Sequence, residues 1–167
     1  MKKLLCICLS LMLLAGCAKK EDAKNGKNEP LTLSGFNAVI TTEFNGIAIS
    51  SNVSYDSAGG YSFSFNSPKI LENLTVSGKD GEFTLSGEAL ALNLQSDKLP
   101  SAMICRALND CVNAVSGAYP IKDDAGLFEY AYSVDKVPCV LYTDENKKFQ
   151  KLLVGGQEFI FESFSYN

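Results

Sequence analysis

The stretch GYSFSFNSP, residues 60–68, places an aromatic side chain at every second position of its first half. Tyr61, Phe63 and Phe65 therefore share one face of an extended chain, because successive side chains of a β-strand point to opposite faces. Strict alternation of this kind is typical of a strand that buries one face. Gly60 and Pro68 bound the run, and both residue types are common where strands end. The stretch predicts one strand of a half-buried sheet.

Similar alternating runs fill the chain from residue 31 onward, and Gly, Asn and Asp separate them. They predict strands at residues 36–44, 47–55, 60–65, 70–77, 82–86, 89–94, 127–134, 137–143, 148–154 and 158–166. Because the connections are short, neighbours in sequence should pair in antiparallel fashion. Lys79-Asp80-Gly81 and Gly155-Gly156 supply hairpin turns, since Gly tolerates positive φ angles. The segments LTLSG (31–35), LTVSG (74–78) and FTLSG (83–87) look alike, and we interpret them as recurring strand ends because their spacing is irregular.

One helix is predicted, at residues 98–116. Ser96 or Asp97 can cap its start, and Gly117 followed by Pro120 ends it. An apolar stripe on one side of this helix predicts that it packs on the sheet, with Arg106 lying off the stripe. The stripe consists of Ile104, Leu108, Cys111, Val112 and Val115. The predicted fold class is α+β, a large curved antiparallel sheet, or half-barrel, wrapped around one main helix.

The N-terminus has the layout of a secretory signal peptide. A charged start, Met1-Lys2-Lys3, precedes an apolar run at 4–14, which is too short to span a bilayer because about 20 apolar residues are needed. The segment Leu14-Ala15-Gly16-Cys17 resembles the lipobox of bacterial lipoproteins. This resemblance implies a diacylglycerol thioether on Cys17, cleavage before Cys17, and acylation of the new N-terminus, for example with palmitate. The alternative is an ordinary signal peptide with an incidental cysteine.

Three segments follow from these patterns. Residues 1–16 are a cleaved lipoprotein signal peptide, residues 17–30 are the lipidated cysteine and a flexible tether, and residues 31–167 are a single half-barrel domain. We expect the chain on the cell membrane, lipid-anchored on its extracytoplasmic face, or on an outer membrane if the organism has one. From Leu31 onward the chain has 9 basic and 16 acidic residues. This acidic balance argues against nucleic acid as a primary ligand.

Residues that could support catalysis or metal binding are scarce. The chain contains no histidine, which excludes nucleophile activation by histidine and histidine-containing zinc sites. The acidic pairs Asp123-Asp124 and Asp144-Glu145 lie in predicted loops, where solvated side chains are expected. We therefore predict no catalytic residues, no metal, no cofactor and no enzymatic activity.

Three cysteines remain in the predicted domain, Cys105, Cys111 and Cys139. Cys105 and Cys111 are about 9 Å apart along a helix, which is too far for a disulfide. A bond from Cys139 to either of the others is compatible with an exported protein, but buried free thiols are favoured.

Aromatic stripes on the predicted sheet are the candidate ligand-binding residues. They are Tyr61, Phe63, Phe65, Phe128, Tyr130, Phe159 and Phe161. A curved sheet lined in this way would form an apolar pocket, whereas the simpler interpretation is that these residues are the core beneath the helix. One helix, however, covers only part of so large a sheet.

The lipobox, the Lys-rich tether, the run at 60–68, the late helix and the C-terminal strand FIFESF (159–164) together resemble the lipoprotein-localisation superfamily of LolA-like and LolB-like proteins. The resemblance implies an antiparallel half-barrel on a helical plug, with an apolar cavity for acyl chains. Our leading hypothesis is therefore a non-enzymatic envelope lipoprotein that binds a lipid or acyl chain. The alternative is an envelope module that binds another, unidentified protein without a small ligand.

Overall fold

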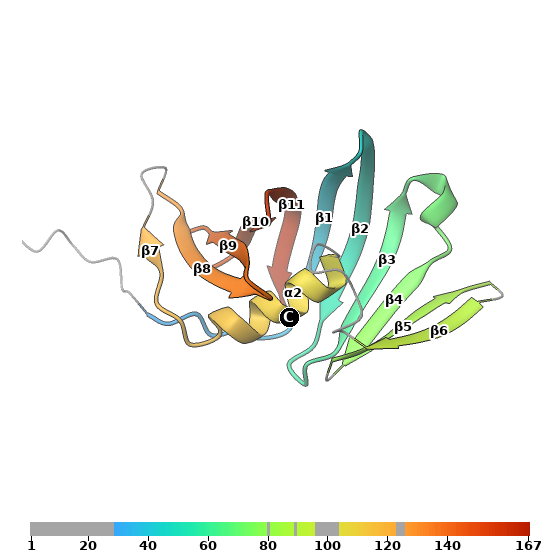
Figure 1. The fold of residues 1–167 in the computed structure, drawn as a ribbon. Coiled ribbons are helices and arrows are strands. Elements are labelled where there is room, and N and C mark those ends of the chain that lie inside the picture. Colours follow the sequence, from blue (N-terminus) through green and yellow to red (C-terminus); the bar gives the residue numbers. More distant parts are fainter. Residues whose placement is uncertain (1–28, 80, 89, 96–103, 123–125) are drawn as a thin grey trace, which may run out of the picture.

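The computed structural model describes residues 29–79, 81–88, 90–95, 104–122 and 126–167. Within them, one 11-stranded sheet contains every strand, in the order β6-β5-β4-β3-β2-β1-β11-β10-β9-β8-β7, and all of its pairs are antiparallel. The sheet curves around helix α2 (Figure 1). The predicted half-barrel fold class is confirmed.

The sheet is open and consists of two runs of consecutive antiparallel strands, β1 to β6 and β7 to β11, which the pairing of β1 with β11 joins. The strands are β1 Phe36–Phe44, β2 Ile47–Tyr55, β3 Tyr61–Ser67, β4 Thr75–Lys79, β5 Glu82–Gly87, β6 Leu90–Gln95, β7 Ile121–Lys122, β8 Phe128–Val134, β9 Val137–Thr143, β10 Phe149–Val154 and β11 Gln157–Tyr166. The last strand, β11, pairs with the first, β1, with Tyr166 opposite Phe36. This pairing places the two ends of the domain in the middle of the sheet.

The bounds of most strands agree with the alternation in the sequence, and β1 and β2 match their predicted ranges fully. The turn between them is Asn45-Gly46, and both residues have positive φ angles, of 50° and 76°, as two-residue hairpins require. Lys79 pairs with Glu82, so the predicted hairpin between β4 and β5 is also confirmed.

Two strand predictions need correction. Residues 70–77 do not form one strand, because the 3₁₀ helix η1, Lys69–Leu71, precedes β4, which begins only at Thr75. Pro68 ends β3 and opens this 3₁₀ turn, since proline lacks the N–H that continues a strand. The edge strand β7 was not predicted, because two residues carry no detectable alternation.

Helix α2, Ile104–Val115, lies on the inner, concave side of the sheet (Figure 1). Most of the predicted stripe is buried, together with Cys105 and Ala107. Gly117 has a φ of 77°, as expected of a residue that ends a helix. The first part of the predicted helix, with its caps, lies outside the described residues. Arg106, which the sequence places off the apolar stripe, is buried as well: its residue surface is only 8% exposed.

The start of the domain is fastened to the end of this helix. Leu31 is fully buried, its N–H donates to the carbonyl of Ala118 at 3.1 Å, and its carbonyl accepts from the N–H of Gly117 at 2.8 Å. The N–H of Asn167 donates to the carbonyl of Gly35 at 2.8 Å. Residues 1–28, which include the predicted signal peptide, Cys17 and most of the tether, lie outside the described residues.

Candidate ligand-binding face

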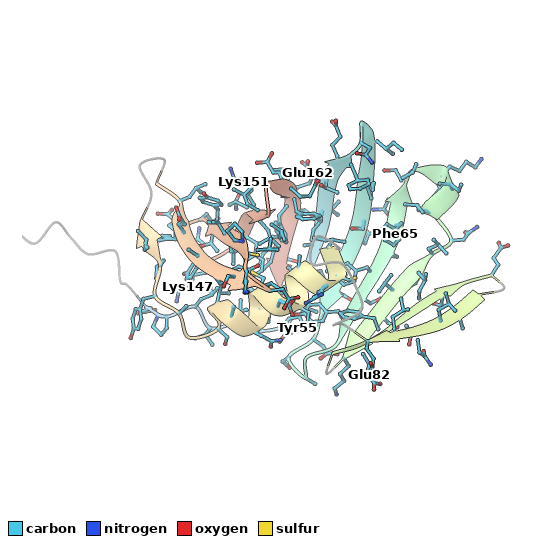
Figure 2. The ribbon with its side chains drawn as sticks, in the orientation of Figure 1. Tyr55, Phe65, Glu82, Lys147, Lys151 and Glu162 are labelled. Atoms are coloured by element: carbon cyan, nitrogen blue, oxygen red, sulfur yellow. The ribbon has the colours of Figure 1, made fainter. Side chains whose placement is uncertain are left out.

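The inner face of the sheet unites the aromatic residues that the sequence singled out. Each of them belongs to the core or packs against it, and they come from β3, β8 and β11. Tyr61, Phe63, Tyr130, Phe159 and Phe161 are buried, whereas Phe65 and Phe128 are half-buried. Figure 2 labels Phe65 on the β3 side of the helix. The structure places these residues mainly in the core between the sheet and α2, and their role in ligand binding stays a prediction.

A second group of aromatic residues, which the sequence analysis did not single out, joins this core. The ring of Phe36 lies 5.2 Å from Tyr55, 5.4 Å from Phe149 and 4.9 Å from Phe164, measured between centroids. Such pairs each add about 0.5–1.5 kcal/mol beyond the area that they bury. Alternation in β1 and β11 already placed Phe36 and Phe164 on strands, but only the pairing of the first and last strands brings them together.

The inner face continues beyond the part that is buried beneath α2, and there it is apolar and open. At the β1–β2 hairpin, Phe44 and Ile47 are paired neighbours that are 56% and 54% exposed. They fall in the same alternation phase as the buried Ile40 and Val53, so they extend the core-facing side of their strands.

A second exposed apolar region lies on the inner face of the edge strand β6 and its neighbour β5. On β6, Leu92 is 46% exposed and pairs with Leu85, and Leu94 pairs with the buried Phe83. We call these two regions the open face, consisting of Phe44, Ile47, Ile49, Leu85, Leu92 and Leu94. Ile70 of η1 is a further large apolar side chain in solvent.

Arg106 is a buried charged residue of α2, on the inner side of the sheet. Its guanidinium pairs with Asp110 one turn later at 3.4 Å and with Asp135 in the β8–β9 turn. Asp135 and Lys136 both have positive φ angles, of 49° and 70°, which fits a tight hairpin turn. The ion pairs therefore join α2 to the β8–β9 hairpin.

The three cysteines of the domain are free and buried. Burial raises the pKa of the Cys111 thiol to about 12 and that of the Cys105 thiol to about 11. The pKa of Cys139 is also raised by burial. A thiol with a raised pKa is a poor nucleophile because the thiolate is the reactive form. The preference for buried free thiols over a disulfide is confirmed.

Asp144 lies between β9 and β10. The carboxylate of Asp144 accepts hydrogen bonds from the N–H groups of Asn146 and Lys148, both at 2.9 Å, so the interpretation of Asp144 as a turn residue is confirmed. Asp123 and Asp124 lie outside the described residues. No group of His, Cys, Asp or Glu suited to a metal occurs among the described residues.

None of the described helices is both long enough and apolar enough to cross a bilayer.

No protein-family model matches the sequence, and no curated protein matches it. Solved structures are similar in fold. An uncharacterized conserved protein from Thermus thermophilus has a TM-score of 0.52 and 10% identity, over 80% of this chain and 79% of that chain. The LolA superfamily protein NE2245 from Nitrosomonas europaea has a TM-score of 0.45 and 7% identity, over 84% of this chain and 89% of that chain. At 10% identity, the likeness to the Thermus thermophilus protein shows a shared fold.

Proposed function

We propose that this chain is a lipid-anchored protein of the cell envelope that binds an apolar ligand, a lipid or acyl chain, on the inner face of its half-barrel. The open face carries the proposal. Phe44 and Ile47 extend the core-facing side of the sheet, yet more than half of each is exposed. An apolar surface that continues a core into solvent favours an apolar occupant.

The energetics suit a hydrocarbon chain. Each methylene that leaves water contributes about 0.8 kcal/mol, so a chain that buries ten methylenes gains roughly 8 kcal/mol before the cost of ordering it. That gain corresponds to roughly micromolar binding if ordering costs little. A ligand along the open face would also reach Phe65, the half-buried member of the β3 stripe.

The lipobox at Leu14-Ala15-Gly16-Cys17 supports the anchored state. A thioether-linked diacylglycerol with a further acyl chain supplies enough buried methylenes for stable attachment, whereas one chain alone is marginal. The proposal therefore has two parts, an anchor at Cys17 and a binding domain from Leu31 onward.

A direct test uses the mature chain, residues 17–167, with Cys17→Ser so that the protein carries no lipid of its own. A fluorescent C16 fatty acid serves as the probe, and its affinity is measured by titration. Phe44→Ser combined with Ile47→Ser should weaken binding at least tenfold, because both side chains leave the open face.

Ile121→Ser is the matched control for this test. Ile121 is 66% exposed, lies on β7 and pairs with Glu129, away from the open face. It should leave the affinity unchanged. A mature chain that takes up no fatty acid, or a double variant that binds like the parent, would overturn the assignment.

The alternative function is a protein-docking module, and the edge strand β6 favours it. Leu90–Gln95 stands at the end of the sheet, and its sequence LALNLQ contains no charge and no proline. Such edges readily accept another strand. A crosslinked envelope partner that is lost with Ala91→Pro and kept with Phe44→Ser would favour docking over ligand binding.

A further inference from the structure

The outer face of the sheet, which points away from α2, carries two continuous rows of neutral and mostly polar side chains across seven strands. The first row runs through Ser165, Asn37, Ser54, Ser62, Ser77 and Thr84 and ends at Asn93. The second runs through Ser163, Val39, Asn52, Ser64, Thr75 and Ser86 and ends at Ala91. Within a row, each residue is the direct partner of the next, so hydroxyl and amide groups recur at about the 4.7–4.9 Å strand spacing.

Both rows lie wholly in the described residues, and neither contains a charged side chain. Because 20% of the chain is charged, rows of this length on a solvent-facing surface would be expected to include charges. Charged side chains do occupy the neighbouring part of the same face, where Lys151 pairs with Glu158 at 3.5 Å. Lys151 and Glu162 mark this charged flank in Figure 2. Contact with water therefore does not by itself explain why the two rows are neutral.

The outer surface has a depression where the two rows cross β11, β1, β2 and β3. A trough of about 340 Å³ lies there, lined by Asn37, Asn52, Ser54, Ser62, Ser64 and Ser163 among others. The amides of Asn52 and Asn66 exchange hydrogen bonds of 2.8 and 3.1 Å, which fixes the orientation of Asn52.

The hydroxyls of the trough are available to a ligand. Those of Ser54, Ser62 and Ser64 make no side-chain hydrogen bond within the described chain. These three hydroxyls thus offer donors and acceptors that no side chain in the described part of the chain uses, whereas the amides of Asn37 and Asn52 are held by Asn167 and Asn66.

We propose that this trough binds a neutral glycan, an extended chain of uncharged hexose units. Hexose hydroxyls both donate and accept, as do serine hydroxyls and asparagine amides. The repeat of an extended hexose chain is close to the spacing of the strands, so successive sugars meet equivalent groups on successive strands. The absence of charge in the trough selects for an uncharged polymer. The domain has 9 basic and 16 acidic residues from Leu31 onward, and this negative balance disfavours anionic polymers.

The geometry limits the length of glycan that the trough can hold. Four strands span three intervals, or about 14 Å, which accommodates roughly three to four sugar units. Beyond that, the twist of about 20–25° between strands turns the rows away from a straight polymer. Aromatic stacking plays no part in this contact, so we expect a dissociation constant on the order of a millimolar. Several anchored copies on one membrane would add avidity on a long glycan.

The test uses the mature chain with Cys17→Ser, labelled with ¹⁵N, and follows amide shifts by NMR. The probes are chitotetraose, cellotetraose and maltotetraose, with a sulfated tetrasaccharide for comparison. At least one neutral probe should give saturable shifts confined to β11, β1, β2 and β3. Ser54→Glu should weaken that binding tenfold or more by placing a carboxylate in the trough.

Ser133→Glu is the matched control, because Ser133 is an exposed serine on the outer face of β8, outside both rows. It should bind the neutral probe like the parent chain. The proposal is overturned if all three neutral probes fail to bind, if Ser54→Glu binds as well as Ser133→Glu does, or if the sulfated probe binds equally tightly. None of these results depends on fatty acid binding at the open face.

Discussion

At the scale of single residues, the contact between Gly78 and Phe83 explains why the segment LTVSG ends in glycine. The two residues are direct partners across β4 and β5, and the ring of Phe83 covers the glycine. A Cβ at position 78 would stand inside van der Waals contact of the Phe83 ring and 3.1 Å from the carbonyl oxygen of Glu82. Phe83 is buried and has little room to move. Any residue larger than glycine at position 78 therefore carries a packing cost.

Gly78→Ala should lower the free energy of unfolding by about 1–3 kcal/mol, because overpacking a buried contact costs that much. Urea denaturation followed by circular dichroism measures the change. Gly87→Ala is the control: its Cβ would come closest to the far end of the Leu74 side chain, at 2.9 Å, which can rotate away, and would lie at an ordinary contact distance of 3.5 Å from the carbonyl oxygen of Asn73. Equal losses in the two variants would contradict this account of Gly78.

The segments LTLSG, LTVSG and FTLSG look alike in the sequence, but the sequence alone does not explain why each of them ends in glycine. The structure gives the three glycines different neighbours: Asn167 at Gly35, Phe83 at Gly78 and Leu74 at Gly87. Only two of the three segments end in strands, since 31–35 is not part of one. The local pattern indicated recurring strand ends, but the groups that surround each glycine come from the partner strand or from a distant part of the chain.

At the scale of elements, α2 combines features that the sequence predicted with one that it missed. Apolar periodicity identified the buried stripe, because side chains at a helical spacing share a face. Burial of Arg106 was not predictable in this way, since its partner Asp135 is in a hairpin turn that becomes adjacent only after folding. The boundary of β4 and the short strand β7 were likewise fixed by pairing rather than by composition.

The buried thiol of Cys111 makes the docking of α2 sensitive to alkaline pH. Its pKa is raised by burial from the ordinary value of 9.0 to about 12. Between these values the unfolded chain loses the proton while the folded chain keeps it, so stability falls as pH rises above 9. The slope for one such group is about 1.4 kcal/mol per pH unit.

Cys111→Ala removes this contribution and should flatten the decline of stability between pH 9 and 11 by about 1.4 kcal/mol per unit. Urea titrations of parent and variant under reducing conditions, at intervals of one pH unit, measure the difference. From pH 6 to 8 the two stability curves should run parallel, because the thiol is protonated in both states there. Parallel curves above pH 9 as well would show that Cys111 does not titrate as described.

At the scale of the whole molecule, the domain offers two contrasting faces. The inner face is apolar and partly open, and the outer face over the central strands is polar and neutral. Alternation along each strand predicted this division, because it assigns every residue to one face. Which residues on a face meet depended on the order of strands: the pairing of β1 with β11 brings the rings of Phe36 and Phe164 within 4.9 Å of each other.

Attachment to the membrane is the remaining property of the whole molecule, and it tests the role of Cys17. A Cys17→Ser chain has no thiol to receive diacylglycerol, so it should be neither labelled by palmitate nor retained with membranes. The acidic domain offers anionic headgroups little attraction. Metabolic labelling and fractionation of the full-length chain measure both outcomes.

Cys6→Ser is the matched control for Cys17→Ser, since Cys6 lies within the predicted signal peptide and leaves with it. That variant should be labelled and membrane-bound like the parent chain. A high-salt wash separates the anchor from weaker attachment, because electrostatic contacts to lipid are screened within about 3 Å at 1 M salt whereas buried acyl chains are not. If Cys17→Ser remains with the membrane after this wash, the domain itself holds the bilayer, and the open face rather than the lipid becomes the candidate for that contact.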